Sequence, residues 1–215
     1  MIETVKYYAA LSQGDDDKVQ QLIQEAMKAG ESPDTILKEG LISAMEQIGT
    51  KFAEGELYIP EVLISAKAMH AGLSILKPIS SKYSGDMMGK VVIGTVRGDI
   101  HDIGKNLVIM MIEGGGFEVV DLGVDVSPEA FVEAIHKYQP HVVGMSALLT
   151  TTMGEMENTI QAIEKAGLRK NVKTIVGGAP ITEDFSRDIG ADGYAREAGS
   201  AVVVVKSLLG KEIKN

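Results

Sequence analysis

The sequence contains no cysteine. This absence excludes disulfides, thiolate-bound zinc and cysteine-ligated iron–sulfur clusters. No stretch approaches 18 uninterrupted apolar residues, so no transmembrane helix is expected. Residues 1–6 lack a basic region followed by an apolar one, which argues against a signal peptide. We therefore expect a soluble protein of the cytoplasm that does not associate with membranes.

Positive charge is also scarce. The 21 Lys and Arg residues are outnumbered by 30 Asp and Glu residues, which gives a formal net charge of −9. This balance argues against nucleic acid or an anionic membrane surface as a partner. With 215 residues, the chain has room for one large domain or two small ones.

The first 80 residues have helical patterns. Residues 14–17 offer an acidic N-cap to a helix that ends near residue 29, and Ser32-Pro33 begins another. Apolar residues then recur every three or four positions from residue 37 to 52. Pro60 begins a further helix, and a short one is expected around residues 5–11. These segments predict a four-helix bundle.

After residue 90, strand and helix patterns alternate. Strands are expected at 91–96, 117–121, 140–146, 172–176 and 192–194, with helices beginning near 104, 128, 154, 182 and 198. The sequence therefore predicts an α/β fold: an N-terminal four-helix bundle followed by a flavodoxin- or Rossmann-like domain with a five-stranded parallel sheet. We expect a helical cap domain at 1–80, a linker at 79–89 and an α/β domain at 90–215.

The segment after the first expected strand carries the most informative chemistry. Asp99 and His101 follow that strand directly, and Gly104 comes before an apolar helical stretch. This order puts an imidazole at the carboxyl edge of the sheet, where open α/β folds bind ligands. Asp99 can accept the second ring N–H of the histidine, as acids do beside metal-binding imidazoles. The pattern is therefore that of a metal-binding histidine. By contrast, His136 and His141, at a helix end and a strand start, are expected to be structural.

Three spaced motifs extend this pattern: Asp99-x-His101-x-x-Gly104, Ser146-x-Leu148 and Gly177-Gly178. Together they resemble the signature of the corrinoid (cobalamin-binding) proteins of methyltransferase systems. The chain is also similar to the cobalamin-binding module of cobalamin-dependent methionine synthase. The resemblance runs from about residue 14 to 209 and includes residues 52–62, which resemble the segment over the upper face of the corrin.

The resemblance implies a corrinoid methyl carrier that cycles between cobalt(I) and methyl-cobalt(III) and is not catalytic alone. Its implied partners are a donor-specific methyltransferase, an acceptor methyltransferase serving tetrahydrofolate, another pterin or a thiol, and a reductive activator. Methanol, methylamines, betaine and methoxyaromatics all remain open as methyl donors. The alternative is a cobalamin-binding sensor or regulatory protein. A receiver domain is disfavoured, because Met145-Ser146 stand where its acceptor aspartate would be.

The resemblance also implies roles for individual residues. His101 would be the lower cobalt ligand of a base-off cobalamin, and Asp99, His101 and Thr152 would form a relay. The residues expected to contact the cofactor are Gly98, Asp99, Ile100, His101, Asp102, Ile103, Gly104, Ser146, Leu148, Thr150, Gly177, Gly178 and Ala198. Asp102 could instead be only a helix-start acid. Glu197 stands before Ala198 where the family usually has an aspartate.

The helical module has an implied role of its own. Phe52, Ile59 and Val62 match the apolar cap over the methyl group in the related proteins. A dry cap would shield the reactive cobalt from water and oxidants, and it must move aside for a partner's active site. The expected linker at 79–89 is the hinge candidate.

Overall fold

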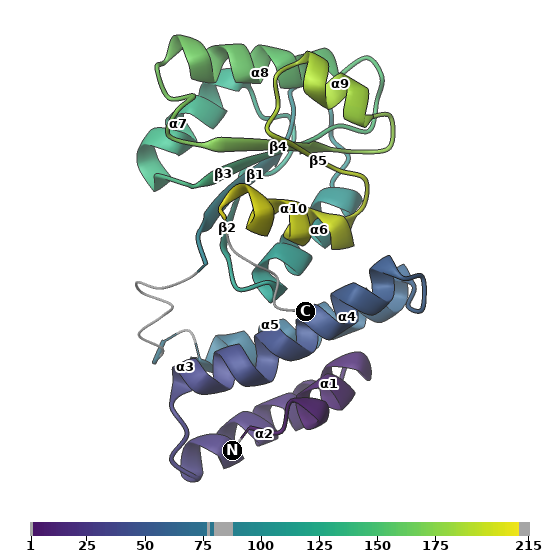
Figure 1. Cartoon of the computed structure of the whole chain (residues 1–215), viewed down its shortest axis with the longest axis vertical. Coiled ribbons are helices and arrows are strands. Elements are labelled where there is room, and N and C mark those ends of the chain that lie inside the picture. The colour runs from purple at the N-terminus through teal and green to yellow at the C-terminus, as the bar shows by residue number, and fades with distance from the viewer. Residues whose placement is uncertain (1, 77, 80–87, 211–215) are drawn as a thin grey trace. The chain divides into compact units, whose positions relative to one another are not determined.

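The computed structural model describes residues 2–76, 78–79 and 88–210 (Figure 1). The chain divides into two compact units: residues 1–88 with 113–117, and residues 89–112 with 118–215. The linker expected at 79–89 lies mostly outside the described residues, because residues 80–87 are not among them.

The first unit is built from helices. Its elements are α1 (Thr4–Ser12), α2 (Asp16–Lys28), α3 (Pro33–Thr35), the π-helix η1 (Ile36–Ile42), α4 (Ser43–Ala53) and α5 (Ile59–Leu76). Because α3, η1 and α4 follow one another without a break, they form one rod, and the unit has the four helical rods predicted. Helix α2 packs against α5, and α1 packs against both α4 and α5.

Local sequence explains where these helices begin. The Asp15 side chain accepts a hydrogen bond from the Lys18 N–H at 2.9 Å, and the Ser32 hydroxyl accepts one from the Thr35 N–H at 3.1 Å. Each bond satisfies a backbone donor that the first turn leaves free. Both caps are those predicted from the sequence.

The apolar stripe from residue 37 to 52 predicted one regular helix, but its first part is a π-helix. The Ser43 hydroxyl donates to the Lys38 carbonyl, five residues earlier, at 3.0 Å. The Tyr7 ring lies against Gly40, where a Cβ atom would come within 3.1 Å of it. Hydrophobic spacing of three and four does not distinguish a π-turn from an α-turn, so the sequence missed this feature.

The second unit is a five-stranded parallel sheet. Its strands are β1 (Lys90–Thr95), β2 (Glu118–Asp121), β3 (Val142–Ser146), β4 (Lys173–Gly177) and β5 (Gly193–Ala195). They lie in the order β2-β1-β3-β4-β5, the flavodoxin-like arrangement. The predicted fold class is confirmed, and the predicted strands match the observed ones within two residues at most ends.

Helices cover both faces of this sheet. They are α6 (Ile103–Gly114), α7 (Pro128–Tyr138), α8 (Gly154–Lys165), α9 (Glu183–Asp188) and α10 (Ala198–Leu208). Figure 1 shows α6 and α10 on one face and α7, α8 and α9 on the other. Because all five strands are parallel, their carboxyl ends lie at one edge of the sheet, where the loops that follow β1, β2 and β3 meet.

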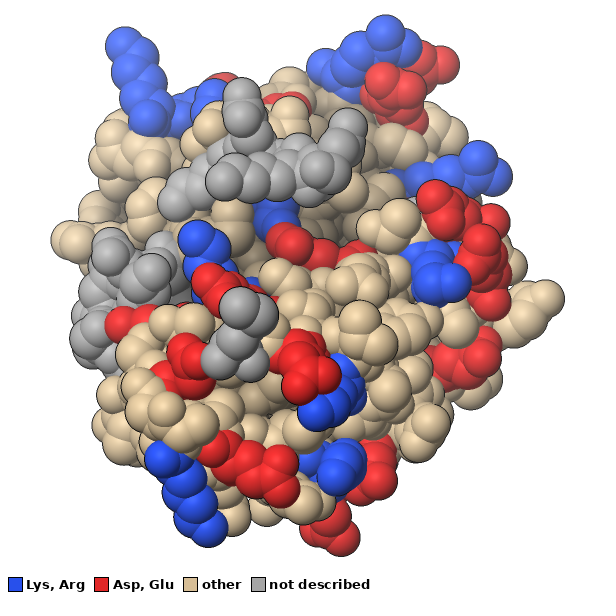
Figure 2. All heavy atoms as spheres, turned by 60° about the horizontal axis from the view of Figure 1, so that its bottom comes forward, with Lys and Arg blue, Asp and Glu red and all other residues tan. Residues whose placement is uncertain are grey.

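The surface carries mixed charge. Figure 2 shows a face on which Asp and Glu side chains are interspersed with Lys and Arg. Exposed ion pairs in the first unit include Lys51 with Glu56 at 2.8 Å. Within the described ranges, no helix is both long enough and apolar enough to cross a membrane.

Candidate functional site

A tight turn carries the chain from β1 to His101. The Asp99 N–H donates to the Val96 carbonyl at 3.1 Å, and Gly98 has a φ of 78°. A positive φ at the third position is typical of a type II turn and favours glycine there. This turn buries the Asp99 side chain completely and leaves the His101 side chain 46% exposed.

The buried Asp99 carboxylate lies at the centre of a hydrogen-bond network. Its Oδ1 accepts from the His101 N–H at 3.1 Å and lies 2.7 Å from Nδ1 of the same residue. Its Oδ2 accepts from the N–H groups of Leu148 and Leu149 at 2.8 and 3.2 Å, and from the Thr152 hydroxyl at 2.8 Å. The loop after β3 is thereby joined to the turn after β1.

These contacts determine the charge of Asp99. Burial acts to raise the pKa of its carboxyl group, but hydrogen bonds from Leu148 and His101 outweigh burial and hold the pKa well below its usual value. An ionised carboxylate can only accept hydrogen bonds. A ring proton of His101 therefore lies on Nδ1, and in the neutral ring the lone pair of Nε2 is available to a ligand.

The Thr152 hydroxyl has two acceptors within reach. Besides Asp99, it can donate to the Leu149 carbonyl at 2.9 Å. Since a hydroxyl has one proton, it serves one acceptor at a time. The structure thus places Asp99, His101 and Thr152, the residues predicted as a relay, in one hydrogen-bonded chain.

Sequence reasoning missed three residues that hold this turn or the start of the helix that follows it. The buried Thr95 hydroxyl donates to the His101 carbonyl at 2.9 Å. Asp125, on the loop after β2, accepts from the Gly98 N–H at 2.7 Å. The buried Lys105 Nζ lies 2.7 Å from Asp121 and ties the first turn of α6 to the end of β2. A threonine at a strand end or an acid in a loop has no sequence signal of its own, but a lysine within an apolar helix could have been noticed.

Large apolar side chains lie exposed on the segments that surround the imidazole. Ile100 is 74% exposed, Ile103 82% and Leu148 45%. Leu149 and Val124 are exposed to a lesser degree, and the sequence analysis did not name either. An apolar surface of this kind around one polar atom is typical of a ligand site.

The predicted small residues fall into two groups. At Gly178, a Cβ atom would come within 1.9 Å of the Ala147 carbonyl oxygen, and at Gly177 within 2.8 Å of that of Ala195. These glycines are required by the close approach of neighbouring strand ends. At Gly104, by contrast, a Cβ atom would meet nothing within 4 Å, so the protein itself does not require glycine there.

The remaining predicted residues differ in exposure. Ser146 ends β3 and is half-buried, Thr150 is exposed, and Ala198 is buried as the first residue of α10. Asp102 precedes α6, where its side chain accepts from the Asn106 amide at 3.1 Å, as a helix-start acid would. Gly98 is exposed at the turn.

The residues predicted as a cap belong to the first unit. The Phe52 side chain is half-buried and Val62 is fully buried. The Ile59 side chain lies outside what the structure describes.

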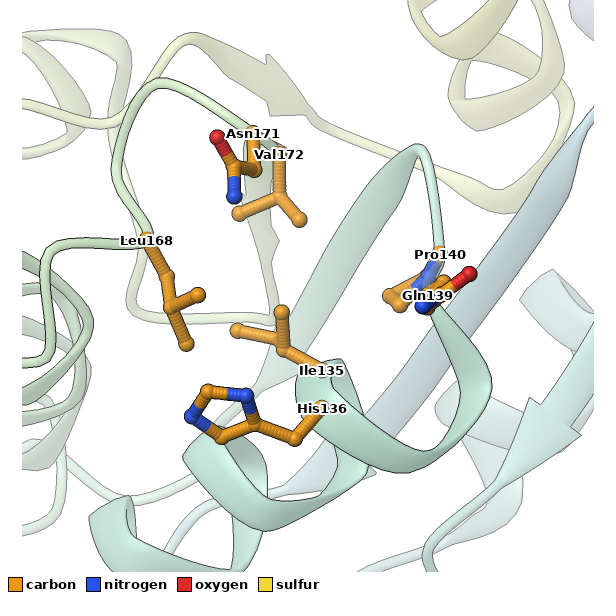
Figure 3. A pocket seen from close by; sticks show the side chains of 7 residues that line it. All are labelled: Ile135, His136, Gln139, Pro140, Leu168, Asn171 and Val172. Carbon is orange, nitrogen blue, oxygen red and sulfur yellow. The ribbon is translucent and has the colours of Figure 1, made fainter.

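A hollow of about 250 Å³ lies at the other edge of the sheet. Pro140 and Val172, which line it, lie two residues before β3 and one residue before β4, so it adjoins the amino ends of these strands (Figure 3). Its lining includes His136 but none of the residues predicted to bind a cofactor. The His141 ring Nδ1 accepts from the Lys90 N–H at 3.1 Å, which makes His141 structural, as expected.

Known proteins resemble this chain over most of its length. Residues 89–203 match the model of a family described as "B12 binding domain", and residues 5–77 match a second model with the same description. A trimethylamine corrinoid protein of Methanosarcina barkeri is 43% identical over 93% of this chain and 93% of its own length. The chain belongs to the corrinoid proteins of methyltransferase systems.

Solved structures of corrinoid proteins also resemble it. A cobalamin-binding protein from Desulfitobacterium hafniense covers 97% of this chain and 99% of its own, with 30% identity and a TM-score of 0.80. The methanol:cobalamin methyltransferase complex of Methanosarcina barkeri covers 96% of this chain and 79% of its own, with 30% identity and a TM-score of 0.84. The recognition made from sequence motifs is confirmed.

The residues at the carboxyl edge of the sheet fit a corrinoid. Within the described part of the chain, no three His, Asp or Glu side chains gather to hold a metal ion. One imidazole alone is a weak site for a free cation, but a corrin brings the equatorial nitrogens of its cobalt with it. An accessible Nε2 amid exposed apolar side chains is therefore the kind of site that a corrinoid requires.

Proposed function

We propose that this chain is the methyl-carrying subunit of a corrinoid-dependent methyltransferase system and binds its cofactor base-off, with Nε2 of His101 as the lower axial ligand. The observation that carries the proposal is the 2.7 Å separation of His101 Nδ1 from a fully buried, ionised Asp99. In the neutral ring, this contact puts the proton on Nδ1 and leaves the Nε2 lone pair free, on the side of the ring away from the carboxylate. In the family, the bound corrinoid accepts a methyl group from one partner and gives it to another.

The chain's own residues orient and charge the imidazole. The anionic Asp99 holds the proton on Nδ1 and stabilises positive charge on the ring. A proton on Nε2 would make the ring an imidazolium, and the adjacent carboxylate would offset its positive charge. The Thr152 hydroxyl can rotate to donate either to Asp99 or to the Leu149 carbonyl as the charge on the imidazole changes.

The chain is proposed to work only with partners, because it supplies a carrier and not a donor-specific active site. A methyltransferase for the donor would load it, and a second, serving tetrahydrofolate, another pterin or a thiol, would unload it. The similarity to a trimethylamine corrinoid protein at 43% identity favours a methylated amine as the donor. A reductive activator and a cytoplasmic location remain predictions.

The helical unit is proposed to act as a cap. Phe52, Ile59 and Val62 would cover the upper face of the corrin and exclude water. Alanine variants of Phe52 and Ile59 should speed the oxidation of the reduced cofactor in air. An unchanged oxidation rate would remove the cap from the proposal.

Reconstitution with hydroxocobalamin tests the proposed function. We expect one cobalamin per chain and an absorption spectrum that shifts as the cofactor's own base is displaced. His101→Ala should abolish that shift, whereas His136→Ala, an exposed histidine far from the turn, should not. Failure to bind cobalamin, or an unchanged spectrum in His101→Ala, would refute the proposal.

A further inference from the structure

Asp125 has an unusual backbone conformation. Its φ is 54°, in the left-handed region that non-glycine residues seldom adopt. Among the described residues, the other non-glycine residue with a positive φ is Gln139, at 48°. Gln139 ends α7, a common place for this conformation, but Asp125 lies in the loop between β2 and α7. A strained residue in a loop at the ligand edge calls for a compensating contact.

The compensation is a pair of reciprocal hydrogen bonds to the turn that precedes His101. The Gly98 N–H donates to the Asp125 carboxylate at 2.7 Å. The Asp125 N–H donates in return to the Asp99 carbonyl at 2.9 Å. The left-handed backbone of Asp125 presents its N–H and its carboxylate to two successive residues of the same turn.

This pair holds two backbone groups of the turn. The side chain of Asp99 is held by the loop after β3, its N–H by the Val96 carbonyl, and the His101 carbonyl by Thr95. Asp125 bonds instead to the N–H of the Arg97–Gly98 peptide and to the carbonyl of the Asp99–Ile100 peptide. If these two peptides rotated, the Asp99 side chain and the imidazole that it orients would move with them.

We propose that Asp125 is a positioning residue that fixes the peptides before Gly98 and after Asp99 and so sets the orientation of the His101 ring. The inference rests on the proposed role of His101 as the cobalt ligand. Asp125 touches neither the ring nor the metal and acts through Gly98 and Asp99.

Two substitutions at this position separate the carboxylate from the backbone. Asp125→Gly keeps the left-handed backbone without strain and keeps the N–H, but it removes the acceptor for Gly98. Asp125→Asn keeps a side-chain oxygen at the same place, and asparagine tolerates the left-handed region. Gln139→Gly relieves the same kind of strain away from the site and serves as the matched control.

The first measurement is hydrogen exchange of the Gly98 amide in the cofactor-free protein, followed by NMR. Asp125→Gly should speed this exchange about tenfold, since the amide loses its acceptor. Asp125→Asn should stay within about twofold of the wild type. Gln139→Gly should leave the exchange unchanged.

The second measurement is cobalamin affinity, together with the nitrogen coupling in the electron paramagnetic resonance of the cobalt(II) form. Asp125→Gly should weaken binding roughly tenfold and reduce the fraction of molecules with nitrogen coupling. Asp125→Asn and Gln139→Gly should match the wild type in both readouts. Such a pattern would support the inference.

Unchanged Gly98 exchange or unchanged affinity in Asp125→Gly would overturn the inference. Equal losses in Asp125→Gly and Asp125→Asn would overturn it as well, because asparagine retains the acceptor. A different result would refute the proposed function, namely unchanged nitrogen coupling in His101→Ala. A wild-type-like Asp125→Gly beside an altered His101→Ala therefore contradicts the role of Asp125 alone.

Discussion

Nδ1 of His101 lies 2.7 Å from Oδ1 of Asp99, whose side chain is completely buried. A buried carboxylate is normally costly, and here hydrogen bonds from two loops offset that cost. The result is an imidazole with a fixed tautomer on an exposed turn. The proposed cofactor chemistry rests on this pair.

Replacing Asp99 with asparagine should release control of the tautomer. The amide can turn its NH2 group toward Nδ1, which then becomes an acceptor and puts the ring proton on Nε2. We expect cobalamin affinity to fall by about 10- to 100-fold in Asp99→Asn. Titration followed by absorption measures this, with Asp184→Asn, in an exposed ion pair with Arg187, as the control. Equal affinities in the two variants would contradict the orienting role of Asp99.

The Thr152 hydroxyl should matter through its hydrogen bond and not through its shape. Thr152→Val keeps the size of the side chain but removes a donor from a buried carboxylate. We expect a loss of about 1–2 kcal/mol in the free energy of unfolding of the cofactor-free protein. Thr152→Ser, which keeps the hydroxyl, should lose less than half as much. Urea denaturation of both variants decides the point, and equal losses would assign the effect to packing.

Two glycines of the signature should respond in opposite ways to alanine. Gly178→Ala puts a methyl group against the Ala147 carbonyl at a φ of 138°, so we expect a loss of about 3 kcal/mol or more, or failure to fold.

Gly104→Ala lies in a helix with open space beside it, and it should keep or slightly raise stability, by up to about 1 kcal/mol. If a corrin lies against this turn, the added methyl group should still weaken cobalamin binding. Thermal unfolding and cobalamin titration of both variants test the pair. A Gly104→Ala variant with unchanged affinity would remove Gly104 from the site.

Asp192 should contribute stability that depends on pH. Burial acts to raise the pKa of its carboxyl group, but bonds from Arg169 and Thr174 outweigh burial and lower the pKa below its usual value. A carboxyl group with a lowered folded-state pKa stabilises the fold above its unfolded-state pKa, about 3.9, and loses that effect as the pH falls through the folded-state value.

Asp192→Asn should therefore cost about 1–2 kcal/mol at neutral pH, and the difference from the wild type should shrink below about pH 4. Asp184→Asn, in an exposed pair with Arg187, should have little effect at any pH. Urea denaturation across the pH range measures both. A difference for Asp192→Asn that stays constant down to pH 2 would contradict the assignment.

Most of the fold could be predicted from local sequence patterns. Alternating strand and helix signals give β1 to β5 within a residue or two, because parallel strands are short apolar runs bounded by turns. The capping residues Asp15 and Ser32 were predicted because capping depends on a few consecutive residues. The π-helix at Ile36–Ile42 was not, since apolar spacings of three and four fit both helix types.

Some contacts of the candidate site could likewise be predicted from local sequence, whereas others depend on the fold. Asp99 and His101 lie two residues apart, so their pairing could be predicted from spacing. The contacts of Thr95 and Asp125 join residues brought together by the order of the strands in the sheet, and no local pattern indicates them. Thr152 came from family resemblance, and only the fold explains why its hydroxyl reaches Asp99 from 53 residues away.

Isotope-edited electron paramagnetic resonance tests the central claim most directly. Protein labelled throughout with the heavy nitrogen isotope is reconstituted with unlabelled cobalamin and reduced to the cobalt(II) form. If His101 is the axial ligand, each cobalt line should split into two, the pattern of one heavy nitrogen from the protein. A three-line splitting, which the cofactor's own unlabelled base would give, or the absence of nitrogen coupling would contradict the account.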